Sequence, residues 1–104
     1  MILRRDRFRD VVARQLDLFT EDEAELLAEA HEADAAWTSA DRDDTEDLYG
    51  DYQLVADAVG ERLYDVREAY ATTLDERAAK EYRAAYDRAA AKRFKRLAGF
   101  LEGA

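Results

Sequence analysis

Apolar residues recur at steps of three and four along most of the chain, which is the spacing of amphipathic α-helices. The most regular run has steps of 4, 3, 4, 4, 3 and 4 residues and comprises Leu48, Tyr52, Val55, Val59, Leu63, Val66 and Tyr70. The next run comprises Ala78, Tyr82, Ala85, Tyr86, Ala89, Leu97 and Phe100. We predict two long helices, over about 44–72 and 75–101, joined so closely that they pack as an antiparallel hairpin. The second helix has two candidate starts: Thr73 with Glu76 forms a capping box, and Asp75 is an alternative N-cap.

Two shorter helices are predicted before this hairpin. Their apolar faces are Phe8, Val11, Val12, Leu16 and Phe19, and then Leu26, Leu27, Ala30, Ala33 and Trp37. Thr20 and Glu23 have the spacing of a capping box, which places the boundary there and gives helices over about 3–19 and 21–38. The sequence therefore predicts an all-α antiparallel four-helix bundle in a single domain, residues 1–104. If the first two helices fuse, the bundle has three long helices instead.

Composition supports this prediction and limits the core. The 104 residues include no Cys and no Pro, which excludes a disulfide framework and argues against a turn-rich β fold. Alanine supplies 21 of the apolar residues, so the core must be thin. No apolar run approaches the roughly 18 residues of a membrane span, and we expect a cytoplasmic protein. High Ala and Arg with little Lys suggest a prokaryotic source.

The formal net charge of −9 is unevenly distributed along the chain. Residues 17–68 hold 18 acidic side chains and 3 Arg, whereas the segments on either side are both basic. The acidic balance makes nucleic-acid binding unlikely, since phosphate contacts dominate that affinity. We expect the basic ends to neutralise the acidic middle within the molecule.

Two charged residues fall within apolar faces. Arg93 lies between Ala89 and Leu97, and Asp34 between Ala30 and Trp37. Folding the hairpins brings a polar cluster to a similar height, made of Arg93, Asp34, Asp51, Tyr52 and His31. We predict a structural ion pair from Arg93 to Asp34 or Asp51, because an unpaired charge there would be costly. The alternative is a binding cluster for a small anion.

A second candidate site consists of carboxylates on neighbouring helices. Glu29 and Glu32 have the spacing Glu-x-x-Glu, and Asp47 and Asp51 follow on the next helix, where a spacing of four keeps both on one face. This pattern resembles the all-α NTP pyrophosphohydrolases, which hold Mg²⁺ against a triphosphate. The resemblance implies a Mg²⁺-dependent hydrolase of a nucleotide or phosphate ester as the alternative function.

The preferred function is a self-associating interaction or regulatory module without catalytic activity or cofactor. A helix over 21–38 covers the next helix only to about Arg62, at equal rise per residue. Beyond that point the apolar seam continues with Leu63, Val66, Tyr70, Leu74, Ala78 and Tyr82. An apolar patch of this size on a small domain indicates an interface, so we expect a homodimer joined through the tip of the long hairpin.

Overall fold

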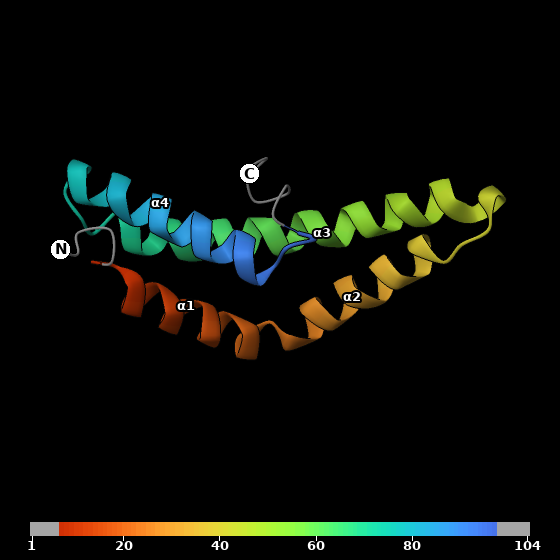
Figure 1. Ribbon diagram of the computed structural model, residues 1–104, viewed down its shortest axis with the longest axis horizontal. Coiled ribbons are helices and arrows are strands. Elements are labelled where there is room, and N and C mark those ends of the chain that lie inside the picture. The colour runs from red at the N-terminus through yellow and green to blue at the C-terminus, as the bar shows by residue number, and fades with distance from the viewer. Residues whose placement is uncertain (1–6, 98–104) are drawn as a thin grey trace.

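The computed structural model describes residues 7–97, which contain four helices and no strand. The helices are α1 (Arg9–Asp22), α2 (Ala24–Thr38), α3 (Arg42–Ala71) and α4 (Glu76–Arg93). Figure 1 shows the long α3 running the length of the molecule, with α1 and α2 along one side and α4 over part of another. The predicted all-α helical bundle is confirmed.

The first two helices continue in the same direction instead of forming a hairpin (Figure 1). Only Glu23, with φ −108° and ψ 27°, separates α1 from α2. A single non-helical residue bends the path but cannot reverse it, because helical hairpins need loops of about two to five residues. The Thr20 hydroxyl donates to the Leu16 carbonyl oxygen at 2.8 Å and caps nothing, so the predicted capping box is wrong. Together α1 and α2 form one bent run antiparallel to α3.

The turn between α3 and α4 shows which of the two candidate residues caps α4. Asp75 is the N-cap of α4, and its carboxylate accepts a hydrogen bond from the Ala78 amide at 2.8 Å.

At its other end α4 stops at Arg93, well before the predicted end, because Phe94 leaves the helical conformation with φ −116° and ψ 57°. Residues 98–104 of the predicted helix lie outside the described residues. With 18 residues against the 30 of α3, α4 covers little more than the second half of its partner.

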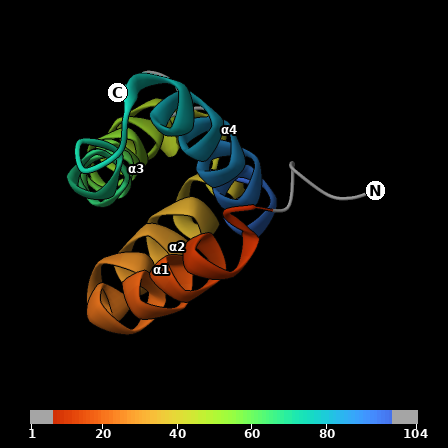
Figure 2. The same cartoon turned by 90° about the vertical axis from the view of Figure 1, so that its left-hand side faces the viewer.

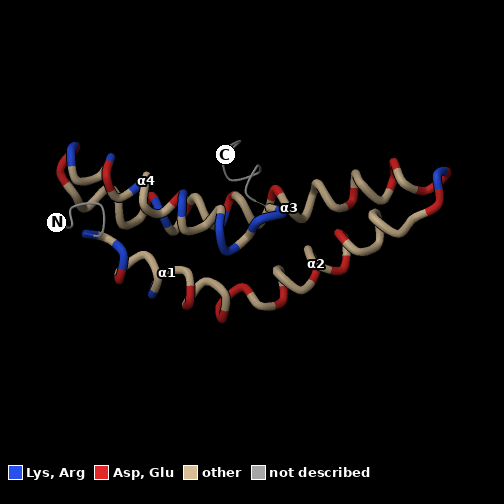
Figure 3. Tube along the Cα trace, viewed as in Figure 1, with Lys and Arg blue, Asp and Glu red and all other residues tan. Residues whose placement is uncertain are grey.

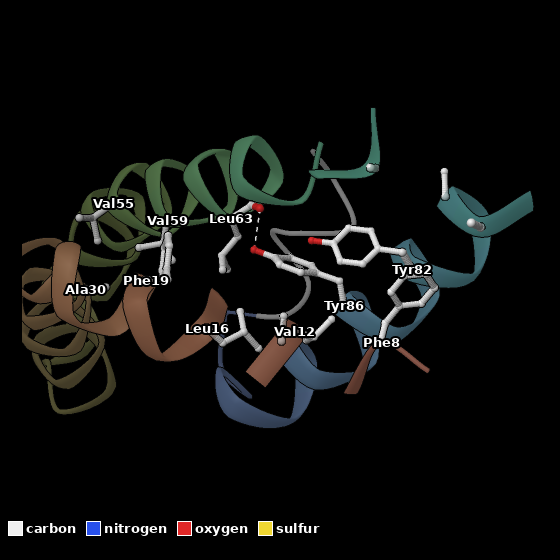
Figure 4. Packing of buried hydrophobic residues seen from close by; sticks show 14 residues of the cluster. Phe8, Val12, Leu16, Phe19, Ala30, Val55, Val59, Leu63, Tyr82 and Tyr86 are labelled. Carbon is white, nitrogen blue, oxygen red and sulfur yellow. Dashed lines mark hydrogen bonds between the residues drawn. The ribbon is translucent and has the colours of Figure 1, made fainter. Parts of the chain in front are cut away.

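The core lies where α1, α3 and α4 surround a common centre (Figures 2 and 4). Its largest buried members are Val12, Leu16, Val59, Leu63, Tyr82 and Tyr86. Both core tyrosines keep their hydroxyls paired: Tyr86 donates to the Leu63 carbonyl oxygen at 2.8 Å, and Tyr82 donates to Gln15 Oε1 at 2.6 Å. Aromatic residues thus fill the space that the many alanines leave, without burying an unpaired hydroxyl.

The surface expected to form a dimer is not an exposed patch. Leu63, Ala78 and Tyr82 are buried, and Val66, Tyr70 and Leu74 are half-buried. The Phe8 ring meets the Tyr82 ring edge-on, with centroids 5.6 Å apart. Because α1 continues away from α2 along α3, it covers this part of the hairpin within one chain. The reason for expecting dimerisation at the hairpin tip was therefore wrong.

Replacing Gly50 by Ala should raise the free energy of unfolding by about 0.5–1 kcal/mol, because glycine loses the most backbone freedom in a helix. Gly50 lies within α3, and a Cβ there would meet no atom within 4 Å. Urea unfolding followed by circular dichroism measures the change. The reverse substitution at the exposed Ala69 of the same helix is the control and should cost a similar amount. Destabilisation by Gly50→Ala would contradict the open space around this position.

Candidate functional site

The segment 92–97 crosses from the end of α4 onto α2 and α3. The Tyr52 hydroxyl on α3 donates to the Arg96 carbonyl oxygen at 2.9 Å, and the Arg96 guanidinium donates to Asp34 Oδ1 on α2 at 2.6 Å. The Phe94 ring packs edge-on against Phe19 of α1, with centroids 5.8 Å apart. Contacts with three helices therefore hold this segment in place.

A pocket of about 390 Å³ lies beside this segment. Its lining residues are Leu27, Ala30, His31, Asp34, Tyr52, Lys92, Arg93, Phe94, Lys95, Arg96 and Leu97. We call it the α4-end pocket. It combines apolar side chains from α2 and the 92–97 segment with four basic side chains and one carboxylate, and its volume lies in the range of small-molecule sites.

The α4-end pocket brings together four of the five residues predicted as a polar cluster. His31, Asp34, Tyr52 and Arg93 line it, whereas Asp51 is exposed and is not among the lining residues. The predicted pairing is wrong: Arg93 binds Asp17 of α1, with N and O 2.8 Å apart, and Asp34 binds Arg96.

The buried positions of α4 explain this difference. Its most buried face comprises Ala78, Ala79, Tyr82, Tyr86 and Ala90. A further step of four from Ala90 places Phe94, and not Arg93 as predicted, on the inward side. The spacing Tyr82, Tyr86, Ala90, Phe94 was the signal that could have identified Phe94.

Asp34 links the pocket to the only tryptophan of the chain. Its Oδ1 accepts a hydrogen bond from the Trp37 indole N–H at 3.1 Å in addition to the bond from Arg96. Burial, and secondly the negative charge of Asp34, raise the pKa of the Tyr52 phenol. Tyr52 therefore stays protonated at neutral pH and acts as the donor to the Arg96 carbonyl oxygen.

Arg93→Met should change the free energy of unfolding by less than about 1 kcal/mol, since exposed ion pairs contribute little. Its partner Asp17 keeps 65% of its side chain exposed, whereas the Asp34 side chain is only 18% exposed. Arg96→Met should therefore destabilise the protein more than Arg93→Met, because within residues 7–97 it leaves a largely covered carboxylate with the Trp37 indole as its remaining donor. Urea unfolding of both variants compares them. A larger loss from Arg93→Met would restore the predicted inward position.

The carboxylates of the candidate metal site do not converge. Glu29 and Glu32 on α2 and Asp47 and Asp51 on α3 are all exposed. Among residues 7–97, no three His, Asp or Glu side chains lie close enough to hold a metal ion. The arrangement gives the Mg²⁺-dependent hydrolase no geometric support.

Beyond the end of α4, no other described helix packs against the pair formed by α2 and α3 (Figure 1). The non-helical residues that follow α4 contact this pair at Asp34 and Tyr52. Aromatic rings lie at the contact between α2 and α3: the Trp37 and Tyr49 centroids are 4.8 Å apart, and Tyr52 lies 6.1 Å from each. A shallow groove, which we call the α2–α3 groove, is lined by Trp37, Ala40, Arg42, Thr45, Glu46 and Tyr49. Tyr49 is 37% exposed. This end of the helix pair therefore presents aromatic surface that no third helix covers in the part of the chain described.

Charge differs between the two halves of the molecule. Residues 24–57, which form α2 and the first half of α3, carry eleven acidic side chains and a single Arg. By contrast, α4 carries six basic and three acidic side chains, and Figure 3 shows basic residues gathered near its end. Two ion pairs provide part of the charge neutralisation expected within the molecule. Arg93 pairs with Asp17 of α1, and Arg96 pairs with Asp34 of α2.

Comparison with known proteins gives no family for this fold. No protein-family model, curated protein or solved structure matches the chain. Among the described helices, none is both long and apolar enough to span a membrane. The functional argument therefore rests on the pocket, the groove and the distribution of charge.

Proposed function

We propose that this protein is a non-catalytic interaction module, which binds a basic amphipathic helix of a partner protein in the α2–α3 groove. The observation that carries this proposal is the difference in length between α3, with 30 residues, and α4, with 18. One half of α3 packs against two other helices, whereas α2 is the only described helix that packs against the other half.

The covered half supports this proposal by showing how a third helix packs here. There, α4 directs Ala and Tyr side chains inward, with Tyr82 and Tyr86 fully buried. In the open half, Trp37 of α2 and Tyr49 of α3 provide a partly exposed aromatic surface. Tyr49 lies about five whole helical turns before Arg67, which bonds Asp87 of α4, so both project from the same side of α3. Trp and Tyr are the residues most enriched where binding energy concentrates in interfaces. A helix bound there would extend the layer that α4 begins.

Charge favours a basic partner over a second copy of the chain. Two copies joined through their open halves would each bring the excess of ten negative charges carried by residues 24–57. Like charges brought together at an interface oppose binding, whereas a basic helix gains attraction from the same surface. Self-association of two copies through this groove is the competing outcome.

The test uses two synthetic amphipathic helical peptides of equal length, one built from Leu and Lys and the other from Leu and Glu. Fluorescence anisotropy with a labelled peptide measures binding. We expect the Leu/Lys peptide to bind and the Leu/Glu peptide to bind at least about tenfold more weakly. Tyr49→Glu should weaken binding by about the same factor. Leu18→Glu is the matched control, because Leu18 is 51% exposed on α1, away from the groove.

Equal binding of both peptides, or equal losses from Tyr49→Glu and Leu18→Glu, would contradict a specific basic partner. Size-exclusion chromatography with light scattering tests the second copy separately. A mass of 11.9 kDa, that of one chain, agrees with our proposal. A dimer that Tyr49→Glu dissociates would show that the groove binds another copy instead.

A further inference from the structure

We propose that the α4-end pocket binds a small amphipathic anion, consisting of one carboxylate on an apolar body. This inference concerns a pocket distinct from the α2–α3 groove and does not depend on the proposed partner helix. Four observations support it: the pocket volume of about 390 Å³, the apolar floor, the basic side chains around it, and the ion pairing of those side chains.

The floor of the pocket is apolar. Leu27 and Ala30 contribute from α2, Phe94 and Leu97 from the segment after α4, and the Tyr52 ring from α3. Ala30 and Tyr52 are buried, and the other three are half-buried. Because Ala30 ends in a single methyl group, it leaves space above it that a larger side chain would fill. A hydrocarbon chain or ring occupying this space would remove apolar surface from water, which favours binding.

The rim of the pocket is strongly basic within an otherwise acidic protein. Lys92, Arg93, Lys95 and Arg96 surround it, against the single carboxylate of Asp34. Asp34 already accepts hydrogen bonds from Arg96 and Trp37, so its charge is locally compensated. His31, at the edge of the pocket, is exposed. This local excess of positive charge selects an anion over a cation or a neutral ligand.

The ion pairs of the described residues occupy two of the four cations. Arg93 is paired with Asp17 and Arg96 with Asp34, whereas neither lysine takes part in an ion pair within residues 7–97. Lys92 and Lys95 are both exposed. Their ammonium groups can therefore turn toward a ligand carboxylate without breaking an existing pair. The two guanidinium groups hold the pocket wall against α1 and α2 and add to the attractive potential.

The probe ligands are octanoate and 1-octanol, which share one apolar chain and differ in the charge of the head group. The Trp37 indole N–H gives a single assignable NMR signal, and it is bonded to Asp34 in the pocket wall. Titration followed by this signal and by isothermal calorimetry measures both affinities. We expect octanoate to bind at least about tenfold more tightly than octanol, with weaker binding at higher salt concentration.

Lys92→Glu combined with Lys95→Glu should lower the affinity for octanoate by about tenfold or more while leaving octanol unaffected. The matched control is Lys80→Glu with Arg88→Glu, which changes the net charge equally at exposed positions of α4 outside the pocket lining. The salt dependence of the unmodified protein tests the role of charge without any substitution.

Three results would each overturn the proposal. The first is the absence of octanoate binding at millimolar concentration. The second is equal affinity for octanol and octanoate, and the third is an equal loss in the control variant. The peptide experiments test Tyr49, whereas the octanoate experiments test Lys92 and Lys95. The failure of one proposal can therefore be distinguished from the failure of the other.

Discussion

Replacing Tyr86 by Ala is expected to lower the free energy of unfolding by about 3–5 kcal/mol, the cost of removing a fully buried aromatic side chain. Tyr86 is completely buried, and its ring lies 5.9 Å from that of Tyr82. Nearby positions of α4, such as Ala79 and Ala90, carry only methyl groups, so the structure has little means of filling the resulting cavity. Because a small domain has only about 5–15 kcal/mol of total stability, this variant should lose a large fraction of it.

Urea unfolding followed by circular dichroism measures this loss, and Tyr86→Phe is the matched control. Phenylalanine keeps the ring and removes only the hydroxyl that donates to the Leu63 carbonyl oxygen, so we expect a cost of about 0.5–1.5 kcal/mol. Similar losses for the Ala and Phe variants would show that the hydroxyl, not the ring, accounts for the contribution of Tyr86.

The second large effect concerns an ion network that joins α3 to α4. Arg83 donates twice to the Glu68 carboxylate, at 2.7 and 2.9 Å, and Arg67 donates to the same carboxylate at 2.9 Å. Arg67 also donates to both oxygens of Asp87, at 2.8 and 3.1 Å. The Arg67 side chain is only 13% exposed, so this network is screened less than an ordinary surface pair. Glu68 is its central acceptor.

Glu68→Gln should cost about 1–2 kcal/mol at neutral pH, because it removes the charge to which two guanidinium groups donate. Hydrogen bonds from Arg83 lower the pKa of Glu68, partial burial opposes them, and the single hydrogen bond from Arg67 adds to the lowering, so that the pKa is about 2. A carboxylate with a lowered pKa stabilises the folded state above its unfolded pKa, near 4.5, and loses that contribution as the pH falls toward 2. The difference in stability between the parent protein and Glu68→Gln should therefore shrink over this interval.

Urea unfolding at pH 7, 5 and 3 measures this difference. Glu61→Gln is the control, since Glu61 is exposed on the same helix and lies outside the network. A difference between the parent and Glu68→Gln that stays constant from pH 7 to 3 would contradict the role of Glu68 as a charged acceptor.

Most of the predicted residues of the candidate site do line the pocket, but the ion pairs between them were not predictable from the sequence. Placing residues at fixed helical steps brought His31, Asp34, Tyr52 and Arg93 to one height, and all four line the α4-end pocket. The arginine that binds Asp34 is nevertheless Arg96, from a segment that is no longer helical. Helical periodicity extends to Phe94 at the C-cap of α4, but it could not place Arg96, which lies in the non-helical residues beyond the cap.

The sequence by itself determined the extent of α3 and the start of α4. The apolar seam of α3, with its regular steps of three and four, predicted a helix over nearly its full observed length. Asp75 is a strong N-cap type, and the short connection before it required α4 to return along α3. These features depend on a few neighbouring residues and on the 3.6-residue helical repeat, which are properties that a sequence carries directly.

The tertiary structure alone decided how the helices share the surface of α3. Only Glu23 interrupts the helical backbone between α1 and α2, so the two form a bent continuous run instead of a hairpin. The continuous run places α1 over Leu63 and Tyr82, which removes the patch expected to dimerise. The end of α4 at Arg93 likewise opens the pocket and leaves the α2–α3 groove uncovered. Both outcomes depend on contacts between residues far apart in the sequence, such as Phe8 with Tyr82 and Phe19 with Phe94.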